Sequence, residues 1–499
     1  MRLIIAARQS VLARIQAFMV GEGLRRAHPQ LELSYAFRES LGDRFQHDPL
    51  WRMPEKGVFT QDFHADLLAG RCDLVVHSWK DLPIEASGGT LIAATMPRAD
   101  MRDLLLLRND AWEDGRKGRV RFLTSSPRRV YNLEPFLREA LPFAVESLEF
   151  MPVRGNIQTR IRKIREQDAH GLIVAKAALD RLLSAERPEF AGTRDEVRRA
   201  IDGCRWMILP LSANPAAAAQ GAIAVEVAEG RPEILDLLAP IHCAGTFAAV
   251  TREREILRGY GGGCHQKIGV SVLERPYGEI VFLRGLTDDG RRLERTTLTP
   301  RRSRPPKISR VEMWPLTRSE SDWFEREAVE PDIPAEATAL WVAKADAWPA
   351  GWESDSSRLV WASGRQTWRR LADRGIWVNG CADGLGEQES PHLETLAGRD
   401  LRWIKLSHEE GYGETGMPLM PGYRLRPHNH PPDLTGKRYF YWTSGSGFHR
   451  ALTLSPGIRE AEHFCGPGNT ERVLRAAGIE PHVFLDHGSW LAEMGEEEA

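Results

Sequence analysis

The sequence predicts an α/β protein built from several domains. With 499 residues, the chain is too long to fold around a single hydrophobic core. Short apolar runs alternate with amphipathic stretches, a rhythm typical of strands that alternate with helices. The composition, 42% apolar and 27% charged, is that of an ordinary globular protein.

A first α/β lobe is expected from residues 1–100, completed by residues 205–223. Its predicted elements are strand, helix, strand, helix and strand, at 2–7, 10–27, 31–37, 59–68 and 73–77. The turn after the first strand contains Arg8 and Ser10. In an open α/β sheet such a turn lies at the carboxyl edge, where free helix N–H groups attract anions.

A second α/β lobe is expected from residues 104–203. Its predicted strands lie at 119–123, 143–151 and 171–175. Arginines recur at the strand ends of this lobe, namely Arg128, Arg129, Arg154 and Arg160. One such arginine is ordinary surface decoration, whereas several at corresponding edges indicate a pocket for a ligand with many carboxylates.

Residues 228–300 are expected to form a small α+β domain, with helical sequence first and strands at 268–273 and 280–286. This domain carries Cys264, which follows glycines at 259, 261, 262 and 263. The flanking His265 and Lys267 favour the reactive thiolate. A tight turn that happens to contain a cysteine is the alternative.

The C-terminal part begins after a charged, proline-containing linker at 301–307. Residues 308–499 contain a weak repeat, in which Thr367, Leu371, Gly375 and Ile376 match Thr470, Leu474, Gly478 and Ile479. Two similar strand-turn-helix halves would explain the repeat, although four matched positions could be coincidence.

Composition excludes several classes of protein. The six cysteines show neither metal-ligand spacing nor a disulfide pattern, so we expect no metal site. A pI of about 6.8 argues against broad nucleic-acid binding. The N-terminal apolar run is too short for a signal peptide, and no run is long enough for a membrane span, so we expect a cytoplasmic protein.

A lysine and a carboxylate follow the predicted strand at 73–77, in the sequence Ser78-Trp79-Lys80-Asp81. A partly desolvated carboxylate at that place could move protons or stabilise a developing cation. A solvated ion pair on a loop is the alternative interpretation.

The first 300 residues resemble hydroxymethylbilane synthase, also called porphobilinogen deaminase. The matching segments, in chain order, are Arg8-Gln9-Ser10, Gly42-Asp43, Lys56-Gly57-Val58-Phe59, His77 to Pro83, Ser125 to Arg129, Arg154-Gly155-Asn156 with Thr159-Arg160, Gln220-Gly221-Ala222, and Gly262-Gly263-Cys264. Each motif is short, but their ordered combination is very specific.

The resemblance implies two lobes like those of periplasmic binding proteins, followed by the cysteine-bearing domain. It implies a dipyrromethane cofactor joined by a thioether to Cys264, and stepwise addition of four porphobilinogens with loss of ammonia. Asp81 takes the place of the family's catalytic aspartate. Each pyrrole carries an acetate and a propionate, and arginine is well suited to bind both.

The remaining site residues follow from the same resemblance. Expected contacts to the cofactor are Lys80, Arg128, Arg129, Ser126 and Asp43, and expected contacts to the substrate are Arg8, Ser10, Arg154, Arg160, Lys56 and Ser78. The chain departs from the family at Val227-Ala228, where a Cys-Arg pair is usual. That change removes an expected substrate-site arginine, for which Arg231 could substitute.

Residues 308–499 resemble a diverged uroporphyrinogen-III synthase, most clearly at 439–447 and 465–470. The resemblance implies a two-lobed α/β domain that closes hydroxymethylbilane, with Thr443, Ser444 and Thr470 as contacts. A non-catalytic appendage is one alternative, and a passive carboxylate-binding protein is an alternative for the whole chain. We expect a monomer that binds porphobilinogen and its tetrapyrrole product, without a nucleic-acid or membrane partner.

Overall fold

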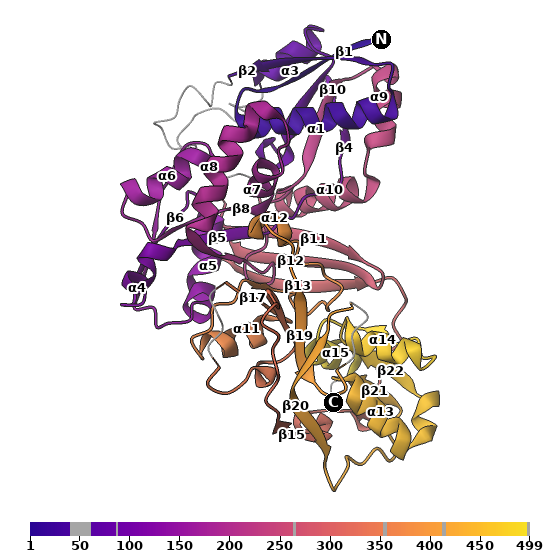
Figure 1. Ribbon diagram of the computed structural model, residues 1–499. Coiled ribbons are helices and arrows are strands. Elements are labelled where there is room, and N and C mark those ends of the chain that lie inside the picture. Colours follow the sequence, from indigo (N-terminus) through magenta and orange to yellow (C-terminus); the bar gives the residue numbers. More distant parts are fainter. Residues whose placement is uncertain (40–60, 86–87, 263–265, 353–356, 412–415, 497–499) are drawn as a thin grey trace.

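The computed structural model describes residues 1–39, 61–85, 88–262, 266–352, 357–411 and 416–496 (Figure 1). Strands within these ranges form five sheets. Two five-stranded sheets belong to the N-terminal half, a three-stranded sheet follows, and a six-stranded and a four-stranded sheet form the C-terminal part (Figure 1). The predicted α/β class is confirmed, with an antiparallel α+β unit in the middle of the molecule.

The first sheet has the strand order β2-β1-β3-β10-β4. Its strands are β1 (Arg2–Arg8), β2 (Glu32–Arg38), β3 (Leu74–Ser78), β4 (Thr90–Thr95) and β10 (Ile223–Ala228), and its helices are α1 (Val11–Ala27), α3 (Gln61–Leu68) and α9 (Pro232–Leu238). Strand alternation explains the two covered faces, since Leu3 and Ile5 pack with α1 whereas Ala6 packs with α3. The strands predicted in this lobe are confirmed to within one residue.

The second sheet has the order β7-β6-β8-β5-β9. Its strands are β5 (Asp103–Arg108), β6 (Arg119–Leu123), β7 (Ser147–Met151), β8 (Gly171–Ala175) and β9 (Cys204–Ile208), and its helices are α4 (Trp112–Gly115), α5 (Pro127–Ala140), α6 (Ile157–Glu166), α7 (Lys176–Leu183) and α8 (Ala191–Asp202). The predicted placement of 205–223 in the first lobe needs correction. Strand β9 pairs with β5 of the second sheet, and only β10 returns to the first. An apolar run fits either sheet, so its local pattern does not reveal its partner.

Two segments therefore join the first and second lobes. The first crossover comprises residues 96–102 and the second comprises residues 209–222, because strands of different sheets flank each. After the second crossover and α9, helix α10 (Ala244–Arg258) packs on an antiparallel meander of β11 (Gly269–Arg275), β12 (Gly278–Leu286) and β13 (Arg292–Pro300). This unit confirms the strands predicted at 268–273 and 280–286.

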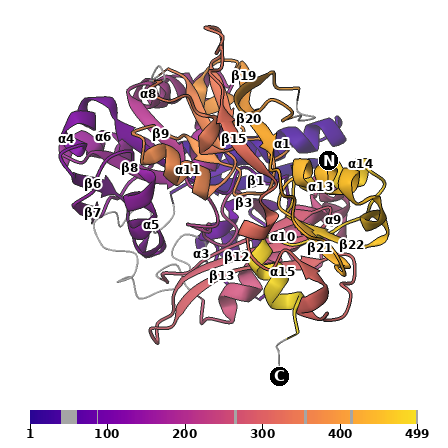
Figure 2. The same ribbon diagram turned by 90° about the horizontal axis from the view of Figure 1, so that it is seen from below.

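The C-terminal part contains two further sheets. The six-stranded sheet has the order β15-β20-β19-β16-β17-β18, with β15 (Phe324–Ala328), β16 (Ala339–Val342), β17 (Leu359–Ala362), β18 (Gly380–Cys381), β19 (Trp403–His408) and β20 (Leu419–Pro427). The four-stranded sheet is parallel, with β14 (Met313–Trp314), β21 (Tyr439–Trp442), β22 (Glu462–Cys465) and β23 (His482–Val483). The helices are α11 (Arg365–Ala372), α12 (Glu394–Ala397), α13 (Gly445–Leu454), α14 (Asn469–Ala476) and α15 (His487–Met494). Helices α13 and α14 lie on the side away from α4 and α6 of the second lobe (Figure 2).

The predicted repeat is visible in the structure. Helices α11 and α14 each follow a parallel strand and are followed by a glycine, Gly375 or Gly478, whose φ is +78° in both copies. The N–H of Ile376 donates to Leu371 O at 3.1 Å, and Ile479 repeats this bond to Leu474 O at 3.0 Å. A left-handed glycine with such a bond is a common helix terminus, so the matched leucine, glycine and isoleucine form the same helix C-terminus in both copies.

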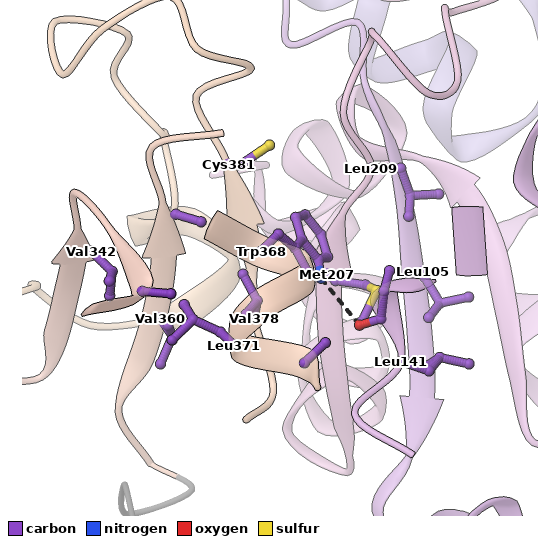
Figure 3. Packing of buried hydrophobic residues seen from close by; sticks show 14 of the residues in the cluster. Leu105, Leu141, Met207, Leu209, Val342, Val360, Trp368, Leu371, Val378 and Cys381 are labelled. Atoms are coloured by element: carbon purple, nitrogen blue, oxygen red, sulfur yellow. Dashed lines mark hydrogen bonds between the residues drawn. The ribbon is translucent and has the colours of Figure 1, made fainter. Parts of the chain in front are cut away.

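The six-stranded sheet is joined to the second lobe through a shared core. Trp368 and Leu371 of α11 face Leu105 and Met207 of the second sheet (Figure 3). The indole Nε1–H of Trp368 donates to Ala140 O at 3.1 Å, so a buried polar group is satisfied across the junction (Figure 3). The continuous apolar contact fixes the C-terminal part against the second lobe.

Among the described residues, no single helix combines the length and apolar composition needed to cross a membrane. One sharply bent pair, Pro232–Ile241 with Ala244–Arg258, meets the length and composition criterion only when its two helices are taken together. Within the same ranges, no group of three or more His, Cys, Asp or Glu side chains is arranged to hold a metal ion.

Candidate functional site

Asp81 lies at the carboxyl end of β3, in the single turn Trp79–Asp81. Trp79 is buried and packs against Phe247 of α10, with ring centroids 5.3 Å apart. Its N–H donates to Ala222 O at the end of the second crossover. A buried strand and an anchored tryptophan therefore hold the exposed Asp81 at the carboxyl edge of the first sheet, as predicted.

Lys80 points toward the second crossover, where its Nζ donates to Gln220 Oε1 at 3.4 Å. Burial lowers the pKa of this lysine, and Asp81 and Asp103 partly oppose that effect. Arg129 and Arg160 of the second lobe are near enough to lower the pKa further. Lys80 thus lies among charged groups from both lobes.

Arg160 and Arg154 belong to the start of α6 in the second lobe. Asn156 caps this helix by accepting from Thr159 N at 2.9 Å, and Arg160 Nε donates to Gly155 O at 2.8 Å. Burial lowers the pKa of Arg160 to about 10, Arg129 and Arg154 add to this, and Asp81 opposes it. The structure therefore places Asp81 of the first lobe near Arg160 of the second.

The paired arginines of α5 are held by a carboxylate that sequence reasoning missed. Asp103 is 0% exposed and accepts four hydrogen bonds. They come from Arg128 Nη2 at 2.8 Å, Arg129 Nη2 at 2.7 Å, Asn214 Nδ2 at 2.8 Å and Gln220 Nε2 at 2.8 Å. Burial alone would raise the pKa of Asp103, but the guanidiniums of Arg128 and Arg129 bring it well below its usual range.

This network connects both crossovers to the candidate site. Asp103 immediately follows the first crossover, whereas Asn214 and Gln220 belong to the second. Since Gln220 also accepts from Lys80, its side-chain amide links Asp103 to the lysine beside Asp81. Arg128 further donates to Pro215 O, so much of its hydrogen-bonding capacity is used inside the protein. Its predicted contact to the cofactor, like that of Arg129, stays a prediction.

The three hydroxyl groups predicted to contact cofactor or substrate differ in whether they already form hydrogen bonds within the protein. Ser78 Oγ lies 2.9 and 3.0 Å from the side-chain amide of Gln16 in α1, so it is engaged within the first lobe. Ser10 and Ser126 precede α1 and α5, and neither side chain makes a capping bond. Arg8 ends β1 in the same region of the sheet. Ser10 and Ser126 are thus the more available of the three hydroxyls.

Three predicted residues, Asp43, Lys56 and Cys264, lie outside the described residues. The suggested replacement of a family arginine needs correction. Ala228 ends β10 opposite Thr90, and Arg231 binds Asp73, which precedes β3. Both positions are at the amino end of β3, the end opposite Asp81, because β10 runs antiparallel to it. Arg231 therefore does not replace an arginine beside Asp81.

In the C-terminal part, the carboxyl ends of the two sheets meet. His408 ends β19, and its Nε2 lies 3.1 Å from Ser446 Oγ at the start of α13. Lys405 Nζ lies 2.6 Å from Glu387 Oε2, and Arg472 of α14 lies 3.0 Å from the other Glu387 oxygen. These four cross-sheet residues, His408, Lys405, Glu387 and Arg472, carried no recognisable sequence signal.

The loops that contain Gly386 and Gly468 approach each other closely near these residues. A Cβ on Gly386 would lie 2.8 Å from the Cα of Gly468, and both glycines have positive φ angles. Of the predicted contacts, Ser444 caps α13 by accepting from Gly447 N at 3.1 Å. Thr443 Oγ1 donates to Ser321 Oγ at 3.4 Å, and Thr470 lies in the first turn of α14. All three predicted residues lie at the carboxyl edge of the four-stranded sheet.

Comparison with known proteins agrees with the N-terminal geometry. Residues 3–236 match the family model described as porphobilinogen deaminase, dipyrromethane cofactor binding domain. Porphobilinogen deaminase of Burkholderia orbicola is 34% identical over 292 residues, which cover 58% of this chain and 80% of that protein. The chain belongs to the porphobilinogen deaminase family. The Roseiflexus member is 33% identical over 291 residues, covering 58% of this chain and 87% of its own.

A solved periplasmic sulfonate-binding protein from Methylobacillus flagellatus is similar to 48% of this chain and 66% of its own, with 12% identity and a TM-score of 0.28. That score is too low to support a fold argument.

The dipyrromethane cofactor of the porphobilinogen deaminase family fits the donors of this site. Its two pyrroles carry four carboxylates, which need several cationic or N–H donors. Among the described residues, the guanidinium of Arg154 and the terminal nitrogens of Arg160 have no protein hydrogen-bond partner, and the buried Nε of Arg129 has none. Arg129, Lys80 and Ser126 would hold the carboxylates of the cofactor, and Arg154 and Arg160 would remain for those of the substrate; these assignments stay predictions.

Proposed function

We propose that the chain is a hydroxymethylbilane synthase that joins four porphobilinogens, one at a time, to a dipyrromethane attached through a thioether to Cys264. Family membership and the grouping of Asp81 with Lys80, Arg154 and Arg160 across two lobes support this proposal. When bound, the dipyrromethane supplies the free pyrrole carbon to which the next unit is added.

Asp81 is proposed to move the protons of each addition. Its carboxyl group donates a proton to the substrate amine, so that the C–N bond breaks and ammonia leaves. The resulting carboxylate stabilises the positive charge left on the methylene-pyrrole. Asp81 then takes up the proton that the pyrrole carbon loses as the C–C bond forms, which restores its starting state.

The arginines are proposed to bind and orient the carboxylates. Each addition brings an acetate and a propionate. Arg160 interacts electrostatically with Asp81 across the lobes, and Arg154 lies near Arg160. Ser10 and Ser126 add hydroxyl donors beside the N termini of α1 and α5. The predicted contacts from Arg8, Arg128, Arg129, Ser78, Asp43 and Lys56 belong to the same proposal.

Intact-mass measurement tests the covalent attachment. Protein purified from a porphobilinogen-producing host should be about 420 Da heavier than its polypeptide, the mass of a dipyrromethane held on a cysteine nucleophile. The matched variant Cys264→Ser should show the bare polypeptide mass. A wild-type protein without any adduct would contradict the synthase proposal and favour a passive carboxylate-binding protein.

We further propose that the C-terminal part closes hydroxymethylbilane to uroporphyrinogen III. The two sheets whose carboxyl ends meet, and the cations Lys344 and Arg326 near His408, support a site for a polycarboxylate. Thr443, Ser444 and Thr470 would contact the substrate at the N-terminal turns of α13 and α14. Burial, together with Lys344 and Lys405, lowers the pKa of His408 to about 4, so its imidazole is neutral at pH 7.

The isomer of the product distinguishes this proposal from a non-catalytic appendage. Incubation of the full chain with porphobilinogen, followed by oxidation and chromatography, should give the type III uroporphyrin without a second protein. A Thr443→Val, Thr470→Val double variant should form the type I isomer at an unchanged rate of porphobilinogen consumption. Type I product from the wild-type chain would leave the C-terminal part without a cyclase role.

A further inference from the structure

A single carboxylate of the C-terminal part holds the second crossover. Asp383, two residues beyond β18, accepts from the N–H of Leu211 at 2.8 Å through Oδ2 and from the hydroxyl of Ser212 at 2.5 Å through Oδ1. The φ of Asp383 is +54°, a conformation that few residues with a side chain adopt. Both carboxylate oxygens thus point at one short piece of the second crossover.

The C-terminal part also contacts the first crossover. Arg102 binds Asp100 through Nε at 2.9 Å and Nη2 at 2.7 Å, which holds the end of this crossover in a tight bend. The same Nη2 donates to Pro391 O at 3.3 Å, and the guanidinium lies 5.4 Å from the ring centroid of Trp361 in β17. Residues of the C-terminal part therefore contact both connections between the lobes.

The crossovers lead directly to the groups of the proposed synthase site. Asp103, which holds Arg128 and Arg129, is the next residue after Arg102. The second crossover contributes Gln220, which accepts from Lys80 and donates to Asp103. A shift of either crossover would change the distance between Lys80 and Asp81 on one lobe and the arginines on the other.

We propose that Asp383 is a positioning residue for porphobilinogen addition, through which the C-terminal part holds the second crossover so that the two lobes present their charged groups at a productive distance. The proposal rests on the synthase function proposed above. Lobes joined by two short segments can reorient unless an interface restrains them, and the reaction needs groups from both lobes at once. Asp383 supplies that restraint without touching the substrate.

Steady-state kinetics of full-length variants tests the proposal. Asp383→Ala should lower kcat for porphobilinogen consumption about tenfold, because two partly buried hydrogen bonds that favour the productive arrangement are lost. Ser212→Ala removes one of these bonds and should have a smaller effect in the same direction. It serves as the milder test if Asp383→Ala is poorly folded.

The matched control removes two hydrogen bonds of the same interface that do not involve a crossover. Arg198 of α8 donates to Leu396 O at 2.7 Å and to Thr395 O at 2.5 Å. Arg198→Ala should therefore weaken attachment of the C-terminal part while kcat stays within about twofold of wild type. Equal losses of kcat in Asp383→Ala and Arg198→Ala would overturn the positioning role.

Hydrogen exchange separates this proposal from the proposed function. Peptides covering 209–222 should exchange faster in Asp383→Ala and Ser212→Ala than in wild type, but not in Arg198→Ala. Unchanged exchange of 209–222 in Asp383→Ala would refute the restraint regardless of activity. A wild-type chain that consumes no porphobilinogen would refute the synthase proposal instead, while the exchange comparison would still report on the crossover.

Discussion

Replacement of Asp103 by Asn should destabilise the second lobe by about 3–5 kcal/mol, the usual cost of removing one partner from a buried ion pair. Asp103 is 0% exposed, and each of its oxygens accepts from one guanidinium and one amide. Asparagine has nearly the same shape but offers one oxygen. Two donors would then lose their acceptor at about 1–3 kcal/mol each, or about 2–6 kcal/mol together, a span that includes the first figure.

The assay is urea unfolding followed by hydrogen exchange of peptides from β5 and α5, because a chain with five sheets need not unfold in one step. The matched control is Asp168→Asn. Asp168 pairs with Arg121 at 2.6 Å, but its side chain is 82% exposed, so the control should cost less than about 1 kcal/mol. A cost for Asp103→Asn within about 1 kcal/mol of the control would refute the assignment of Asp103 as the centre of this network.

The pH dependence provides a second measure of the same group. The folded-state pKa of Asp103 is well below its unfolded value of about 3.9, so its stabilisation is full above that value and is lost as pH falls toward the folded pKa. Between about pH 5 and pH 2, wild type should therefore lose more stability than Asp103→Asn does. An identical loss in both proteins would show that Asp103 is not a depressed carboxylate.

Three further predictions concern catalysis and titration. Asp81→Ala should abolish porphobilinogen consumption without changing the urea midpoint, whereas the exposed Asp236→Ala should keep wild-type activity; substantial turnover by Asp81→Ala would exclude its proton-transfer role. At pH 8, mass mapping should find Cys243 alkylated before Cys204, because bonds from Thr246 lower the pKa of Cys243 whereas burial raises that of Cys204 to about 12. Alkylation of Cys204 before Cys243 would contradict the pKa directions given for the two thiols. Since burial lowers the pKa of His408 from 6.5 to about 4, wild type should lose stability as pH falls between these values, and His408→Gln should lose less.

Local sequence patterns predict many elements because a strand or helix depends on its own side chains. The run at 2–7 is buried on both faces and forms β1, and the Leu-Gly-Ile pattern of the C-terminal repeat ends two helices in the same way. The pattern at 205–223 does not reveal that β9 and β10 belong to different sheets. Strand partners more than 90 residues away leave no trace in the strand itself.

The candidate site likewise contains residues that the sequence could predict and residues that it could not. Asp81, Lys80 and the arginines could be predicted because they follow the carboxyl ends of strands in their respective sheets, and because their motifs resemble those of a known family. Asp103 could not, since a lone aspartate at the start of an apolar strand gives no sign of its four donors. Motif matching alone places Ala228 and Arg231 beside the site, and the antiparallel direction of β10 moves them to its far end.

The sequence by itself determined which chemical groups this protein can use, since the residue types and their positions at strand ends follow from the order of the amino acids. Tertiary structure alone decided which of those groups form hydrogen bonds and ion pairs within the protein and which remain available to bind a ligand. The carboxylates of Asp103 and Asp383 meet partners 111 and 172 residues away, at Asn214 and Leu211. Such contacts form only when separate lobes pack together, so the restraint they place on the site is a property of the fold.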